Sequence, residues 1–407
     1  MLRLAISLGV LFGLALGPAA LPAAASSSAL DVGSSGAPRD RGSGVWINVT
    51  QETGTRHSWP AVTRDGDGWL RLVWTNDIAR SLGTLRISPD GVLGSSASLA
   101  RDCSHINDPA AAYDVPEGRM LVFASLIGGD YLPLADGLYA WAVSGDLNSY
   151  PPSQTPVSGS ASAASGTAMQ AAITPAAVFQ SWSAGGGVYV HRGLTPGGDQ
   201  VVSADGYHGS LALDSRSNRL LVLLARTARG KGGLWWRTID QTTGAGASAA
   251  SRLVHSTTRY RGSSRFKMRD MPVPAAGLAS RAAVVVAYPT GYPSTGTVRV
   301  WRIAPGGPTT SILADDGQDK TLVAVAADPK GRAWVVWAEP DRRRVFARRS
   351  NVGATAWGPV VTVRAPASTG GPWSLVASAQ TDRLEVIAHW NIGMSDAFFY
   401  TQVFPPR

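Results

Sequence analysis

One pattern recurs seven times along this chain: a short strand of small residues, a turn containing Asp, Gly or Asn, and a strongly apolar second strand. The clearest copies are PAVTRDGDGWLRLVW from Pro60, DPAAAYDVPEGRMLVFA from Asp108 and LVAVAADPKGRAWVVW from Leu322. Looser copies begin at Ala171, Ser210, Val273 and Ser374. A spacing of about 40 to 60 residues is typical of four-stranded β-propeller blades. The sequence therefore predicts an all-β, seven-bladed β-propeller, with six blades as the alternative if one loose copy is misread.

The two ends of the repeat region complement each other. The seventh copy stops at Arg407 after its third strand, and the segment VWINVTQ from Val45 precedes the first copy. Pairing the first and last strands in one blade closes the ring and removes exposed sheet edges. We therefore expect the N-terminal strand to complete the last blade.

The first residues predict export from the cell. Arg3 is followed by the apolar run LAISLGVLFGLALG and by small residues up to Ala25, which is the pattern of a secretory signal peptide over residues 1–25. This apolar run is short for a transmembrane anchor, so no anchor is expected after cleavage. Residues 26–44 are rich in Ser, Gly and Ala and predict a flexible leader. The propeller domain is then expected over residues 45–407 of an extracellular or periplasmic protein.

Charge and cysteine content limit the partners and the cross-links. The formal net charge of +9 favours polyanions, which outside a cell include acidic polysaccharides. No groove combining stacking and basic residues in the pattern of a known nucleic-acid module is evident, so no specific nucleic-acid partner is expected. The single cysteine, Cys103, excludes an internal disulfide, and its role stays open. We expect a monomer held together by packing.

The candidate site lies where the chain enters each inner strand, because these loops meet at the mouth of the central funnel. Three histidines, His57, His105 and His208, precede inner strands, whereas His389 lies within an apolar second strand and is expected to be packed in the core. His105 with Asp108, or His208 with Tyr207, is a candidate acid/base pair for proton transfer on a sugar. The alternative is that these are hydrogen-bonded loop residues. No short metal-binding spacing connects the histidines, so neither a metal nor another cofactor is expected.

Aromatic and charged residues complete the predicted funnel. Trp59 and Trp373 stand at the starts of the first and seventh inner strands, where an indole can stack on a sugar ring. Other tryptophans at alternating strand positions are expected to pack between blades: Trp69, Trp74, Trp334 and Trp337. The predicted catalytic residues are His105, Asp108 and His208, and the predicted ligand-binding residues are His57, Trp59, Arg269, Asp270, Asp319, Lys320 and Trp373.

In its D-x-x-G turns and V-V-W-like second strands, the sequence resembles the sialidase-like, or BNR-repeat, secreted propellers. The stretch SNVGATAW, from Ser350 to Trp357, is similar to the Asp box of that family but lacks its Asp. The family's first blade opens with R-I-P, whose Arg binds the sialic acid carboxylate, and the matching stretch HSWPA has Ser58 there. The resemblance implies the propeller fold and carbohydrate recognition, without classical sialidase activity.

Three functions are compatible with these observations. The leading hypothesis is a secreted propeller that recognises an extracellular carbohydrate, most simply an acidic one, in its central funnel. The second is a polysaccharide lyase or glycoside hydrolase acting at the same funnel, so whether the protein is an enzyme stays open. The third is a non-catalytic scaffold that binds other proteins.

Overall fold

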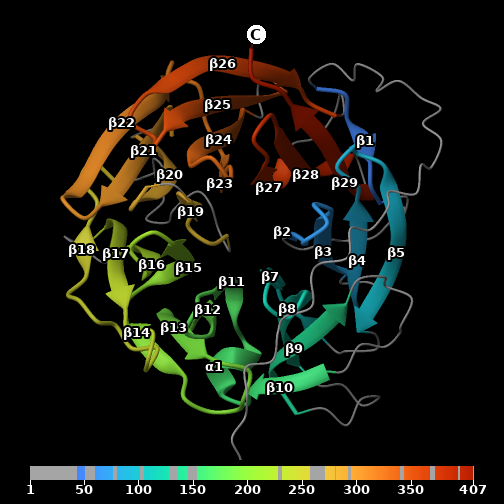
Figure 1. Cartoon of the computed structure of the whole chain (residues 1–407), viewed down its shortest axis with the longest axis vertical. Coiled ribbons are helices and arrows are strands. Elements are labelled where there is room, and N and C mark those ends of the chain that lie inside the picture. The colour runs from blue at the N-terminus through green and yellow to red at the C-terminus, as the bar shows by residue number, and fades with distance from the viewer. Residues whose placement is uncertain are drawn as a thin grey trace, which may run out of the picture. The chain divides into compact units, whose positions relative to one another are not determined.

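The computed structural model describes residues 44–50, 60–76, 80–100, 105–127, 135–144, 154–227, 232–256, 271–279, 281–291, 295–339, 343–366, 372–392 and 395–406. All of them belong to one compact unit that comprises residues 42–407. Seven antiparallel sheets surround a central axis (Figure 1). The prediction of a seven-bladed β-propeller is confirmed, and the six-bladed alternative is wrong.

The strands follow one another outward from the axis in each sheet. Blade 1 consists of β2 (Ala61–Arg64), β3 (Leu70–Asn76), β4 (Ser81–Ile87) and β5 (Leu93–Ala100). Blade 2 consists of β6 (His105–Ile106), β7 (Ala110–Asp114), β8 (Arg119–Ile127), β9 (Gly137–Ser144) and β10 (Gln154–Ser158), and the short helix α1 (Ala161–Ala164) follows it. Blade 3 consists of β11 (Thr167–Ile173), β12 (Val178–Ala184), β13 (Gly187–Arg192) and β14 (Gln200–Ser203).

The remaining blades repeat this order. Blade 4 consists of β15 (Tyr207–Asp214), β16 (Arg219–Arg226), β17 (Gly233–Ile239) and β18 (Ser251–Arg252). Blade 5 consists of β19 (Ala275–Gly277), β20 (Val284–Thr290), β21 (Thr297–Ala304) and β22 (Gly307–Asp315). Blade 6 consists of β23 (Leu322–Ala327), β24 (Arg332–Glu339), β25 (Arg344–Val352) and β26 (Trp357–Arg364). Blade 7 consists of β27 (Pro372–Ala379), β28 (Leu384–Ile392), β29 (Ser395–Val403) and β1 (Ile47–Asn48).

The repeated Asp holds the turn between the first and second strands. In blade 1, the Asp65 carboxylate accepts a hydrogen bond from the Trp69 backbone N–H at 2.8 Å. In blade 6, Asp328 accepts the equivalent bond from the Arg332 N–H at 2.9 Å. A glycine with positive φ, 80° at Gly68 and 75° at Gly331, completes each turn because it carries no Cβ. The same turn chemistry thus sets the register of both inner hairpins.

The hydrophobic core lies between neighbouring blades, on the faces of the second and third strands. All seven residues of β3 are buried, as are seven of the eight residues of β24. Trp74, Trp334 and Trp337 are buried there, which confirms the prediction that they pack between blades. Trp69 differs because it is partly exposed, and the guanidinium of Arg86 lies over its ring, 4.5 Å from the centroid.

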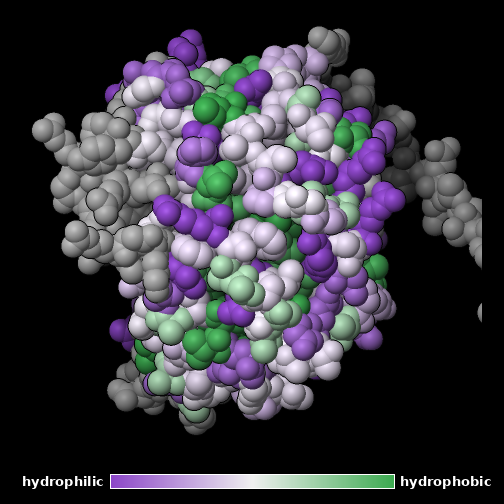
Figure 2. Space-filling view, turned by 90° about the vertical axis from the view of Figure 1, so that its left-hand side faces the viewer, coloured by the Kyte–Doolittle hydropathy of each residue, from purple (hydrophilic) through white to green (hydrophobic). Residues whose placement is uncertain are grey.

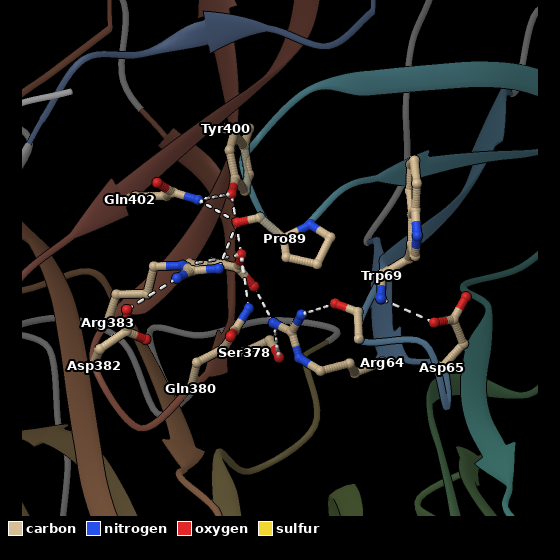
Figure 3. Close-up of polar contacts among 12 residues, drawn as sticks. Arg64, Asp65, Trp69, Pro89, Ser378, Gln380, Asp382, Arg383, Tyr400 and Gln402 are labelled. Atoms are coloured by element: carbon tan, nitrogen blue, oxygen red, sulfur yellow. Dashed lines mark hydrogen bonds and ion pairs between the residues drawn. The ribbon is translucent and has the colours of Figure 1, made fainter. Parts of the chain in front are cut away.

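The ring closes through both backbone and side chains. β1 pairs antiparallel with β29, with Ile47 opposite Tyr400. At the turns between the first and second strands, Arg64 of β2 forms an ion pair with Glu385 of β28 and donates a hydrogen bond to Ser378 Oγ at 3.2 Å. The Tyr400 hydroxyl donates to Glu385 Oε1 at 3.1 Å (Figure 3). A polar network therefore joins blade 1 to blade 7.

The centre of this network is buried. The Glu385 side chain is fully buried, and the Nε of Arg383 lies 3.6 Å from Glu385 Oε1. Burial, together with the negative charge of Glu385, raises the pKa of the Tyr400 hydroxyl, so the phenol stays protonated and can donate. Arg383 and Gln402 also donate to the Pro89 carbonyl of blade 1, the latter at 3.2 Å. Each of these contacts either joins blade 1 to blade 7 or involves a residue that joins them.

The His389 imidazole is 3% exposed and packs against Phe398, with ring centroids 4.9 Å apart, so the prediction that it is a core residue is confirmed. Burial lowers its pKa from 6.5 to about 4. The unfolded chain takes up this proton near its ordinary pKa, whereas the folded chain resists until the pH approaches 4. Above the ordinary pKa the effect is absent, and stability falls as the pH drops through this window.

We expect acidification from pH 7 to 4 to cost about 3 kcal/mol through His389 alone. His389→Leu should lose that component of the pH dependence, as measured by urea unfolding at both pH values. The control is His255→Asn, since His255 is exposed and Asn tolerates its positive φ. Equal pH dependence in His389→Leu and the parent chain would contradict this assignment.

The outer surface mixes polar and apolar residues. Figure 2 shows hydrophobic residues in separate patches among hydrophilic ones on the face that it presents. Exposed apolar side chains include Ile312 on the outer strand β22 and Val360 on the outer strand β26. The described residues on this face therefore do not form one continuous apolar surface.

Candidate functional site

A narrow cavity of about 180 Å³ lies on the propeller axis. The inner strands of six blades contribute to its wall, mainly through Ala, Val, Pro and Met. The two polar side chains among its lining residues are Asp108 of blade 2 and Gln170 of blade 3. The cavity is therefore small, and its wall carries one carboxylate and one amide side chain.

The inner strands depart from regular pairing at one end, where they begin. In blade 2 the strand is interrupted between β6 and β7, at Asn107, Asp108 and Pro109, and both pieces pair with β8. Register shifts interrupt the inner strands of blades 3, 4 and 7, between Thr167 and Gln170, Tyr207 and Ser210, and Pro372 and Ser374. Bulges redirect side chains and are frequent beside functional sites. These irregular starts define the channel mouth.

Two exposed aromatic side chains stand at this mouth. Trp373, inside the blade 7 bulge, is 60% exposed, and Tyr207, at the start of β15, is 41% exposed. Aromatic side chains that are exposed beside a pocket can make contact with a ligand there. The mouth therefore presents an indole face and a phenol to solvent.

His208 lies in the blade 4 bulge with a left-handed backbone, at φ 57°. Its ring centroid is 6.5 Å from that of Tyr207, and its carbonyl accepts a hydrogen bond from Val273 N–H at 3.0 Å. Val273 lines the axial cavity, so the backbone of His208 is hydrogen-bonded to a residue of the channel wall. A left-handed φ is uncommon at a residue other than glycine, and here it coincides with the bulge in β15.

His105 is exposed at the start of β6, and its Nε2–H donates to Asn107 Oδ1 at 2.8 Å. The Asn107 amide in turn donates to the carbonyl of Ala164 in α1 at 3.5 Å. Asp108, the next residue, is buried and lines the cavity. The structure therefore places His105 and Asp108 on one loop, with Asn107 orienting the imidazole.

Asp319 and Lys320 have structural partners. Asp319 Oδ1 accepts hydrogen bonds from the Thr295 N–H at 3.1 Å and from its hydroxyl at 2.6 Å. The Lys320 side chain is fully buried, lies 3.0 Å from Glu339 Oε1 and also pairs with Asp316. This burial gives the ammonium no access to the channel mouth. Lys320 is therefore better explained as a structural ion-pair partner than as the ligand-binding residue that the sequence predicted.

Several predicted residues lie outside the described residues: His57, Trp59, Cys103, Arg269 and Asp270. The structure places His105, His208 and Trp373 at irregular strand starts and Asp108 in the cavity wall. Asp319 and Lys320 precede the regularly paired strand β23 and have structural partners. No sequence pattern predicts the bulges of blades 3 and 4, because Ala168 and His208 adopt left-handed φ without being glycine. The interruption before β7 does carry a signal, since Pro109 has no N–H for the ladder.

The described residues contain neither a membrane-spanning helix nor a cluster of metal ligands. No helix there has the length and hydropathy needed to cross a bilayer. No three His, Cys, Asp or Glu side chains there are grouped as metal ligands would be.

Comparisons with known proteins give fold-level likenesses. No family model matches the sequence, and no curated protein matches it. Among solved structures, the polysaccharide lyase Uly1 is 8% identical, with 85% of this chain and 90% of that chain covered and a TM-score of 0.49. The GH93 α-L-arabinofuranosidase of Fusarium graminearum is 16% identical, with 89% and 97% covered and a TM-score of 0.48. The sialidase of Trypanosoma rangeli is 9% identical, with 86% and 55% covered and a TM-score of 0.44. Identities and TM-scores this low assign no activity to this chain.

Proposed function

We propose that this protein is a secreted β-propeller that binds an extracellular carbohydrate at the mouth of its axial channel. Residues 1–25 would act as the signal peptide and residues 26–44 as a leader to the propeller. The observation that carries the proposal is the exposed Trp373 in a bulge at the same end of the inner strands as Tyr207, His208 and His105. Aromatic faces stack on the apolar faces of sugar rings, and polar side chains around them recognise the hydroxyls.

The chemistry of the mouth supports a polar, ring-shaped ligand. Tyr207 and His105 are exposed and provide a hydroxyl and an imidazole, while Asp108 and Gln170 provide acceptors and donors deeper in the channel. The channel itself, at about 180 Å³, has room for a substituent or a single small group. A sugar chain would therefore lie across the mouth. The net charge of +9 would attract acidic polysaccharides to the protein.

We expect Trp373→Ala to weaken carbohydrate binding by about 30-fold, the loss of about 2 kcal/mol typical of a central aromatic contact. Binding would be found first on an array of acidic and neutral glycans and then measured by calorimetry. Trp69→Ala is the matched control, because Trp69 is also partly exposed but lies at the opposite end of the blades. An array without any specific signal, or equal losses in both variants, would contradict the proposal.

A second candidate, a glycan-cleaving enzyme at the same mouth, is favoured by the oriented His105 beside the cavity-lining Asp108. Such a pair can exchange a proton with a sugar. Incubation with acidic and neutral polysaccharides, following reducing ends and the absorbance of unsaturated uronates, separates the possibilities. New reducing ends together with uronate absorbance indicate a lyase, and new reducing ends without that absorbance indicate a hydrolase. If neither appears and the array is silent, a protein-binding scaffold becomes the better explanation.

A further inference from the structure

A second pocket, of about 310 Å³, lies between blades 6 and 7. It is lined by residues of the β25–β26 hairpin, by Trp334 near the start of β24, and by Pro405 and Pro406 after β29. Second strands start, and third strands end, at the end of the propeller opposite the starts of the inner strands. The pocket is therefore distinct from the channel mouth. Its volume is at the small end of the range for ligand sites and suits one sugar ring.

The walls combine flat apolar surfaces with one cation. Trp357 and the Pro405 and Pro406 rings provide the flat surfaces, and the Arg349 guanidinium lies over the Trp334 ring, 5.5 Å from its centroid. The Nε1 of Trp334 is buried and has no acceptor within the described part of the chain. The Nη1 of Arg349 donates to the Thr381 carbonyl, and the guanidinium has further N–H donors on Nε and Nη2 that an occupant can engage. An occupant with a flat face and an oxygen-rich edge complements this arrangement.

Positive charge is in excess at this place. Arg332 and Arg349 both donate to the Thr381 carbonyl of blade 7, at 3.4 and 3.3 Å. Arg332 lies 3.6 Å from Asp328, whereas no carboxylate of the described residues lies within 4.0 Å of the Arg349 guanidinium. Burial, and then the Arg332 charge, lower the pKa of Arg349, and the negative charge of Asp328 opposes this shift in part. A guanidinium that is partly desolvated and lacks its own carboxylate is stabilised by an incoming anion.

We infer that this pocket is a second carbohydrate site, which binds the carboxylate of a uronic acid residue through Arg349 while Trp357 covers the ring. The carboxylate takes the fork of the guanidinium, the geometry in which Arg recognises it bidentately. The site does not depend on ligand binding at the channel mouth. With both sites occupied, one acidic polysaccharide chain, or two, would be held at opposite ends of the propeller.

The test uses the full mature chain and a galacturonic acid trisaccharide, with the neutral galactose trisaccharide as the comparison ligand. We expect Arg349→Gln to weaken binding of the acidic trisaccharide at this site by about tenfold or more, because a charge-assisted bidentate contact is lost. Trp357→Ala should weaken it independently, which guards against a folding defect in one variant. Arg344→Gln is the matched control, since Arg344 is exposed at the other end of the same strand.

Calorimetric titration of the three variants and of Trp373→Ala gives a result in either direction. The second site is supported if Arg349→Gln and Trp357→Ala lose affinity for the acidic trisaccharide while Arg344→Gln and Trp373→Ala keep it. This result supports the site even if the channel mouth binds nothing. The second site is overturned if only Trp373→Ala loses affinity for the acidic trisaccharide. It is also overturned if the parent chain binds the neutral trisaccharide equally well, or if it binds neither. Melting temperatures within a few degrees of the parent chain exclude unfolding as the cause.

Discussion

Glu385→Ala is expected to lower the free energy of unfolding by about 3–5 kcal/mol, among the largest effects of any single change in this chain. The carboxylate is fully buried between Arg64 and Arg383 and accepts a hydrogen bond from Tyr400. Its removal takes a shared acceptor from two mostly buried guanidinium groups and from the buried Tyr400 hydroxyl, and an unsatisfied buried group costs more than the contact itself contributes. Because Arg64 belongs to blade 1 and Glu385 to blade 7, the substitution weakens the contact that closes the ring.

Urea unfolding monitored by tryptophan fluorescence measures this loss. Glu385→Gln keeps the shape of the side chain and an acceptor oxygen but not the charge. We therefore expect it to lower the free energy of unfolding by less than Glu385→Ala does. Asp382→Asn is the control: Asp382 pairs with Arg383 at 3.0 Å but is 61% exposed, and exposed ion pairs contribute at most about 1 kcal/mol. A loss in Glu385→Ala no larger than in Asp382→Asn would show that the closure does not depend on this network.

Lys320→Met is expected to cost a similar amount, about 3–5 kcal/mol, because it leaves the Glu339 carboxylate buried without its ammonium partner. The double variant Lys320→Met/Glu339→Met should recover most of that stability, since two apolar side chains of similar volume replace both buried charges. Asp316, the other partner of Lys320, is 40% exposed and can be solvated. A double-mutant cycle by urea unfolding measures the coupling free energy between Lys320 and Glu339.

The same variants separate a structural Lys320 from a ligand-binding one. If Lys320 acts only in the core, the folded double variant binds carbohydrate as tightly as the parent chain. A double variant that is stable but has lost carbohydrate affinity would instead return Lys320 to the binding site. Calorimetry below the unfolding transition distinguishes these results.

Much of the candidate site was accessible from the sequence because the repeat identifies the loops that enter the inner strands. His105, Asp108, His208 and Trp373 were predicted from that position alone, and the structure places them at the starts of inner strands or in their bulges. The pattern could not tell Lys320 from these residues. A charged residue before an inner strand can point to the axis or into the blade, and the position of Glu339 on the adjacent strand decides which.

The order of strands and the number of blades followed from the sequence by itself, since alternating apolar residues and Asp-Gly turns are local properties that each repeat carries separately. The tertiary structure alone decided how the blades meet: the bulges at the channel mouth, the closure through Arg64 and Glu385, and the pocket between blades 6 and 7. The physical reason is distance along the chain. Arg64 and Glu385 are 321 residues apart, and no local pattern encodes the burial that makes their contact strong.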